Sequence, residues 1–168
     1  MRELYLFVVW VHVLAAVLWV GGMLFLVAVV VPLLRTPPLR AQALVLLQGV
    51  GLRFRAVGWA ALLVLVASGA AAASFRAGSP AALANAAWWA SRFGRLLALK
   101  LGIVGLVLAL AVVHDFGVGP RATTVLEVAP GSPQAERWRA AARWMGRINL
   151  LLALVVVALA VALVRGGF

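Results

Sequence analysis

The sequence predicts an all-α integral membrane protein whose spans form a four-helix bundle. Hydrophobic residues make up 66% of the 168 positions, only 11% are charged, and the mean hydropathy is +1.12. An ordinary soluble domain has about 25% charged residues. The apolar residues also fall into four stretches, each long enough to cross a hydrocarbon core of about 30 Å. We therefore expect the functional groups inside the bundle or at its rims.

We treat residues 1–168 as one transmembrane domain. The expected spans are about residues 4–31, 55–75, 94–116 and 143–164. Pro32 closes the first span, because proline has no backbone N–H. The second ends in the small residues 70–73, which suit close helix packing. The loop that follows carries Trp88 and Trp89, which we place in the interfacial aromatic belt, on a short helix lying on the membrane.

Glycine and proline bound the third span. Gly117, Gly119 and Pro120 are expected to end it, and residues 121–131 read as surface coil. Ser132 is a candidate helix cap with proline at the next position, so the fourth helix is expected to start near residue 133. Its first turns would then project from the lipid.

The formal net charge of +11 reflects basic residues that flank apolar spans. In that position they contact anionic lipid headgroups and set orientation, so nucleic acid is not an expected partner. One side of the membrane holds Arg35, Arg40, Arg53, Arg55, Arg121, Arg137, Arg139, Arg143 and Arg147, and the other holds Arg2, Arg76, Arg92, Arg95, Lys100 and Arg165. Since basic loops stay inside, we expect a multi-pass cell-membrane protein with both termini extracytoplasmic.

Ionisable residues within a span are functional candidates, because burying them in lipid is costly. One face of the first span carries His12, Ala15, Ala16, Trp19 and Met23. We expect this face to point inward and His12 to ligate haem iron or copper. The alternative is a neutral histidine bonded to a neighbouring helix. Lys100 is expected at the depth of His12, where it either binds the haem or snorkels to the surface.

A second polar level is expected at the opposite rim. It consists of Arg53, Arg55, His114, Arg143, Arg147 and Asn149. These residues could enclose an anion such as the haem propionates, with His114 as a second candidate metal ligand. The alternative is plain anchoring, with Asp115 paired to an arginine. The two histidines differ in height by about 18 Å and so should not share one ion.

The chain lacks the residues that several kinds of chemistry require. The chain has no cysteine, so disulfides and thiolate metal sites are excluded. It also has no glycine-rich phosphate loop and no two carboxylates at one level for acid–base hydrolysis. Methionine occurs at only three positions, too few for the usual thioether copper relay. This inventory favours haem b, with copper as the alternative.

Blocks of residues on all four spans resemble the copper-resistance D (CopD) type of membrane domain. They are residues 10–12, 19–22, 53–59, 68–69, 99–101, 114–116 and 146–150. This resemblance implies copper uptake or tolerance in the cell envelope. The chain is also distantly similar to HemJ-type protoporphyrinogen oxidases, which have a histidine and a tryptophan seven residues apart in the first helix and a lysine in the third. That similarity implies cofactor-binding roles for His12, Trp19 and Lys100.

Three functions therefore stay open at this point. The leading one is a membrane protein that handles haem b or copper in the envelope, in metal homeostasis or electron transfer, with a redox partner or a second copy of the chain as candidate partners. The second is a porphyrinogen oxidase whose rim arginines hold the substrate carboxylates. The third is a structural or assembly protein.

The expected orientation can be tested with a reporter fused after Phe168. Because the side with nine basic residues should be cytoplasmic, a reporter that works only outside the cytoplasm should be active and a cytoplasm-only reporter silent. Activity of the cytoplasmic reporter alone would reverse the assigned orientation.

Overall fold

The computed structural model describes residues 2–165, which are almost entirely helical. Within this range, four stretches are long and apolar enough to cross a bilayer, namely Arg2–Leu33, Ala43–Ala77, Arg92–Val128 and Pro133–Val164. The predicted all-α membrane fold class is confirmed. Large apolar side chains such as Leu63, which is 69% exposed, line the outside of these helices. A soluble surface would not carry so many of them, whereas lipid accommodates them.

The chain divides into two compact units, Met1–Trp88 and Trp89–Phe168. The first contains α1 (Arg2–Phe25), the π-helix η1 (Leu26–Val30), α2 (Val31–Leu33), α3 (Pro37–Arg40), α4 (Ala43–Ala77) and the 3-10 helix η2 (Pro80–Ala84). After α5 (Ala86–Ala90), the second contains α6 (Arg92–Val112), the π-helix η3 (Val113–Val118), α7 (Gly119–Val128) and α8 (Pro133–Val164). The union of both units in one four-helix bundle stays a prediction.

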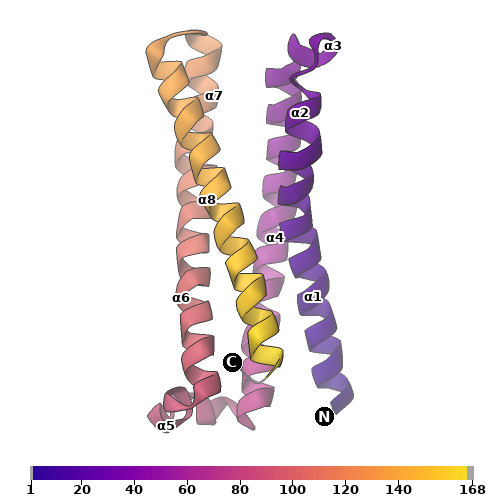
Figure 1. Ribbon diagram of the computed structural model, residues 1–168, viewed down its shortest axis with the longest axis vertical. Coiled ribbons are helices and arrows are strands. Elements are labelled where there is room, and N and C mark those ends of the chain that lie inside the picture. Colours follow the sequence, from indigo (N-terminus) through magenta and orange to yellow (C-terminus); the bar gives the residue numbers. More distant parts are fainter. Residues whose placement is uncertain (1, 166–168) are drawn as a thin grey trace. The chain divides into compact units, whose positions relative to one another are not determined.

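The first unit is an antiparallel hairpin of α1 and α4 (Figure 1). Three of its contacts follow a seven-residue spacing on α1, as in coiled coils, and a fourth lies three residues further along. From one end to the other they are Tyr5 edge-on to Phe75 at 6.0 Å between ring centroids, His12 to Ser68, Trp19 beside Gly58, and Gly22 beneath the ring of Phe54. Small residues on one helix thus receive large side chains of the other.

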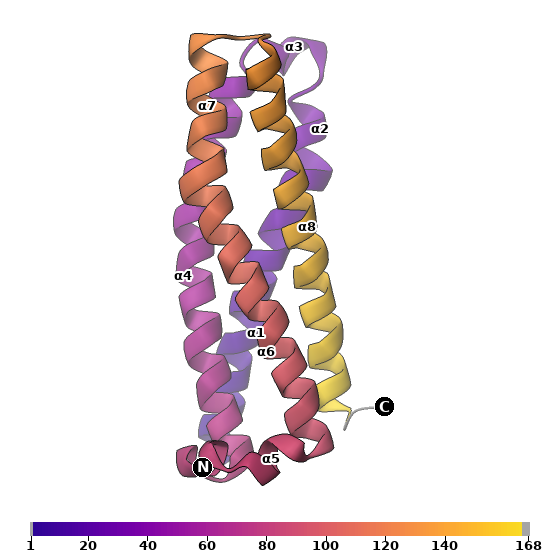
Figure 2. The ribbon, with the colours of Figure 1, turned by 90° about the vertical axis from the view of Figure 1, so that its left-hand side faces the viewer.

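The second unit is also a helical hairpin, in which α8 packs along α6, η3 and α7 (Figure 2). Its buried positions are mostly small or aliphatic: Gly94, Leu97, Val107, Ala111, Ala122, Ala135, Leu150, Ala153 and Ala162. Small side chains let the helix backbones approach closely, which is the usual way that membrane helices associate in the absence of a hydrophobic driving force.

Hydroxyl and glycine caps define the helix ends. Ser91 accepts a hydrogen bond from the Gly94 N–H at 3.0 Å, and Ser132 accepts one from the Ala135 N–H at 3.1 Å. The Ser132 cap is the one expected from the sequence. Gly78 ends α4 with φ of 85°, a left-handed conformation that glycine adopts without strain. The short helix expected near Trp88 and Trp89 is α5.

Two prolines lie inside continuous helices, which corrects the expected end of the third span. The predicted coil at 121–131 is wrong for residues 121–128, because the helix passes Gly117, Gly119 and Pro120 and continues to Val128. The Gly119 N–H bonds the carbonyl oxygen of His114, five residues back, which is the π pattern. This wider turn moves the preceding carbonyls away from the proline ring, so the clash that breaks an α-helix is avoided.

The same arrangement occurs before Pro32. The Val31 N–H bonds the carbonyl oxygen of Leu26, again five residues back, and the helix continues to Leu33 instead of closing at Pro32. At the other π turn, a side chain on residue 119 would place its Cβ 2.9 Å from the carbonyl oxygen of His114. Glycine is therefore required there by the close backbone approach.

The Phe54 contact can be tested by comparing two adjacent glycines. A Cβ at Gly22 would overlap the Phe54 ring, whereas one at Gly21 meets nothing within 4 Å. We expect Gly22→Ala to destabilise the protein by about 1–3 kcal/mol, as overpacking does. Gly21→Ala should instead be neutral or stabilising by up to about 1 kcal/mol, because alanine favours helix. Thermal unfolding in detergent measures both; equal melting temperatures would contradict the contact.

Candidate functional site

His12 is the polar centre of the first hairpin. It lies half-buried on α1, and its Nδ1 is 2.9 Å from the Oγ of Ser68 on α4. Ser68 is only 9% exposed and is the buried polar residue of the described chain. The expected inward face is confirmed: Ala15 and Trp19 are buried, and Ala16 and Met23 are half-buried.

The Ser68 hydroxyl determines which nitrogen of His12 carries the proton. Its single hydrogen is donated to backbone carbonyls of its own helix, the Val64 oxygen and, at 3.4 Å, the Leu65 oxygen. The Oγ can therefore only accept from His12, so Nδ1 carries the hydrogen. The lone pair of the ring then lies on Nε2. A histidine oriented through Nδ1 in this way has the form of a metal ligand with its outer partner in place.

Glycines of α4 make room for the rings of α1. A methyl group at Gly69 would lie 3.3 Å from Cε1 of His12, closer than side chains usually pack. One at Gly58 would lie 3.6 Å from Cδ1 of Trp19, an ordinary contact. Trp19 itself is 7% exposed. Trp19 thus packs into the hairpin on the same face of α1 as His12, two turns further along the helix.

His114 has its own acceptor in the second hairpin. Its Nδ1 is 2.8 Å from Oδ1 of Asp115, and the two side chains are 36% and 23% exposed. An ionised carboxylate only accepts, so the hydrogen again sits on Nδ1 and the lone pair on Nε2. Both residues belong to η3, and π turns within α-helices frequently mark functional sites.

The remaining polar candidates lie at separate places on the second hairpin. Lys100 is half-buried on α6, about two turns from its N-terminus. Asn149 is half-buried on α8, and its Oδ1 is buried without a hydrogen-bond partner among residues 2–165. Such an orphaned oxygen in an apolar helix is costly. It is an acceptor that a ligand with an N–H or O–H group could satisfy.

The arginines of the expected anion site differ in their surroundings. On α4, Arg53 is exposed and Arg55 half-buried. On α8, Arg143 is exposed, and Arg147 lies over Trp144, with Cζ 5.3 Å from the ring centroid. These four residues are divided between the two units, so their joint enclosure of an anion stays a prediction.

Neither hairpin contains a complete metal cage. No group of three or more His, Cys, Asp or Glu side chains could hold one ion in the part of the chain that the structure describes. Each histidine instead has a ring whose Nδ1 carries a hydrogen, so that Nε2 is the nitrogen available as a metal donor. Imidazole nitrogen is a donor suited to copper, iron and zinc.

A family model matches more than half of the chain. The family model of copper resistance protein D matches residues 48–163. The chain belongs to the copper resistance protein D family. The matched region includes Ser68, Lys100 and His114, whereas His12 and Trp19 precede it. Membership points to copper handling in a membrane and lends no support to haem b.

A second comparison covers both histidines. An uncharacterized protein from Aquifex aeolicus (strain VF5) is 33% identical over 168 residues, covering 99% of this chain and 97% of that protein. No solved structure matches the chain.

Ser68 is a site residue that the sequence alone did not assign. It appeared there only as part of the Ser68-Gly69 block. A hydroxyl followed by glycine in the middle of an apolar span is a usable signal, because it marks a polar point with space beside it. Its partner, 56 positions away, becomes identifiable only when the antiparallel pairing of α1 and α4 is known.

The tautomer of His12 can be tested by replacing its acceptor. In wild type, ¹⁵N spectra of imidazole-labelled protein should show His12 with hydrogen on Nδ1. Ser68→Ala removes the acceptor and should shift His12 towards the other tautomer, with a loss of about 1–3 kcal/mol for the unpaired buried group.

Ser74→Ala is the matched control for this change. Ser74 also lies on α4 and donates to a carbonyl of its own helix, that of Ala70, at 3.0 Å. The Ser74→Ala substitution should leave the His12 signals unchanged. A wild-type spectrum with hydrogen on Nε2 would contradict the assignment, and a His114→Ala background identifies which signals are those of His12.

Proposed function

We propose that this protein handles copper in the cell membrane as part of copper homeostasis, and that Nε2 of His12 binds the ion in transit. Two observations support the proposal. The chain belongs to a family named for copper resistance. The hydrogen bond between His12 and Ser68 places the ring lone pair on the nitrogen that faces away from the bond.

The donor set favours exchange over storage. Tight copper sites combine several soft or imidazole ligands. In the described part of the chain, neither histidine belongs to a group of three or more His, Cys, Asp or Glu side chains that could hold one ion. Copper held by so few protein ligands leaves readily, so we treat it as the substrate of the protein and not as a resident cofactor.

His114 is proposed as a second contact for copper. Asp115 holds its Nδ1–H and so orients the ring, as carboxylates do behind metal-bound histidines. The side chain is more than a third exposed, which suits a position where an ion enters or leaves. Its effect on affinity should be the smaller one, because an exposed ligand competes with water.

The other sequence-based hypotheses are retained only as predictions. Binding of haem b at His12, Trp19 and Lys100, electron transfer to a redox partner, and oxidation of a porphyrinogen all require a chromophore. A purely structural role requires no metal at all. A single set of measurements separates these outcomes.

The proposed copper contacts can be tested by titrating purified protein with Cu(I) against a chromophoric chelator. We expect wild type to compete for copper, His12→Ala to abolish the competition, and His114→Ala to lower the affinity without eliminating binding. Ser74→Ala should bind as wild type does.

Absorption spectra of the oxidised and reduced protein accompany the titration. A Soret band that is present in wild type and disappears in His12→Ala would show that the ligand of His12 is haem b and not copper. Stronger loss in His114→Ala than in His12→Ala would move the main contact to η3. Unchanged copper binding in both variants would refute the proposal.

A further inference from the structure

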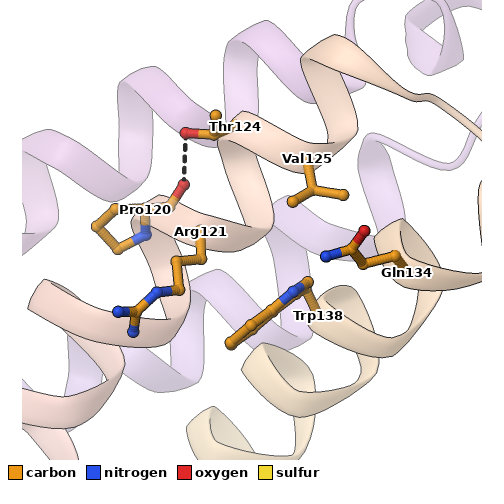
Figure 3. A pocket seen from close by; sticks show the side chains of 6 residues that line it. All are labelled: Pro120, Arg121, Thr124, Val125, Gln134 and Trp138. Atoms are coloured by element: carbon orange, nitrogen blue, oxygen red, sulfur yellow. Dashed lines mark hydrogen bonds between the residues drawn. The ribbon is translucent and has the colours of Figure 1, made fainter.

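A cavity lies in the second hairpin, between α7 and the first turns of α8 (Figure 3). Its volume is about 400 Å³. The lining residues are Pro120, Arg121, Thr124, Val125, Gln134 and Trp138. None of the six is acidic and one is a cation, so the cavity favours an anion.

The exposed Arg121 side chain makes a cation–π contact at this cavity and has space beside Gly117. Its Cζ lies 5.9 Å from the centroid of the Trp138 ring, within cation–π range. Its Nη1 lies 3.8 Å from where a Cβ of Gly117 would be. The side chain therefore extends back along the helix towards the apolar residues, and the absence of a side chain at Gly117 leaves room for it.

From the sequence, the cavity is expected at the level of lipid headgroups on both helices. The helix continues to Val128, but the stretch expected to cross the hydrocarbon ends at Phe116, five positions, or about 7.5 Å, before Arg121. Trp138 precedes the expected fourth span by the same number of positions. The headgroup region beside each face of the hydrocarbon core is about 5–8 Å thick. Tryptophan is enriched at this level because its ring is apolar and its N–H polar.

The hydrogen-bonding groups complete the description of the site. The Thr124 hydroxyl donates to the carbonyl oxygen of Pro120 at 3.1 Å, so its hydrogen is already used. Donors for a ligand come from the fork of Arg121 and the amide of Gln134. Glu136 on the same end of α8 is paired with Arg139 at 2.9 Å. The paired glutamate therefore adds little negative charge to the surroundings.

We propose that this cavity binds the phosphodiester of a membrane phospholipid. Arg121 donates to the phosphate oxygens through its planar fork, which matches phosphate better than an ammonium does. Gln134 donates to a further oxygen, while Trp138 and Val125 contact the glycerol and upper acyl chain. This site is independent of the proposed copper contacts.

Native mass spectrometry of the full chain in a maltoside detergent, titrated with phosphatidylglycerol, tests the proposal. We expect one tightly retained lipid in wild type. Arg121→Gln should weaken its binding about tenfold, the usual effect of losing a charged hydrogen-bond donor. Arg121→Lys should weaken it nearly as much, because the fork and the stacking are lost while the charge remains.

Arg137→Gln is the matched control. Arg137 lies at the same end of α8 and is exposed, but it does not line the cavity. It should change lipid binding by less than about twofold, as expected for an exposed charge. Circular dichroism checks that all variants retain their helix content, and Trp138→Leu provides a second change in the cavity.

Three results would overturn the proposal. The first is an equal loss in the Arg121 and Arg137 variants, which would mean general charge attraction. The second is wild-type binding by both Arg121→Lys and Trp138→Leu. The third is displacement of the retained lipid by inorganic phosphate in the low-millimolar range, which would make the cavity a site for a soluble phosphate.

Discussion

Hydrocarbon offers no hydrogen-bond partners, so each polar group that enters the membrane must find one within the protein. Long helices satisfy the backbone in this way. Where proline removes an N–H, a π turn rearranges the neighbouring bonds, as before Pro32 and Pro120. Side chains obey the same constraint: Ser68 donates to its own helix and accepts from His12. The tautomer of His12 is thus a consequence of the hydrocarbon that surrounds the hairpin.

The exception to this pairing is equally informative. Asn149 has a buried Oδ1 with no partner between residues 2 and 165, at the point where the arginine-bearing half of α8 gives way to a wholly apolar one. This oxygen is the one buried side-chain acceptor that residues 2–165 leave unsatisfied. A low local dielectric makes such an unpaired group costly, so it marks a point where a bound N–H or O–H group would stabilise the helix.

Local signals predicted the four long helices and the Ser132 cap. Ser132 followed by proline is read without knowledge of the fold, and so are the apolar spans. The prolines misled, because the sequence does not distinguish a helix that ends from one that widens into a π turn. The extra residue in η3 also rotates α7 relative to α6, so one periodic pattern could not reveal that Arg121 meets Trp138. The acceptor of His12 depended on a tertiary pairing between distant segments.

The contact of Phe54 with Gly22 affects the axial register in which α1 and α4 pack. A hairpin of alanine, leucine and valine could slide along its axis with little change in buried area, since successive turns present similar surfaces. Here a slip of one turn, about 5.4 Å, would drive the Phe54 ring against a different backbone and part His12 from Ser68. The Phe54 ring therefore fixes the axial register of the two helices, and this register keeps His12 opposite Ser68 although the two contacts lie far apart along the hairpin.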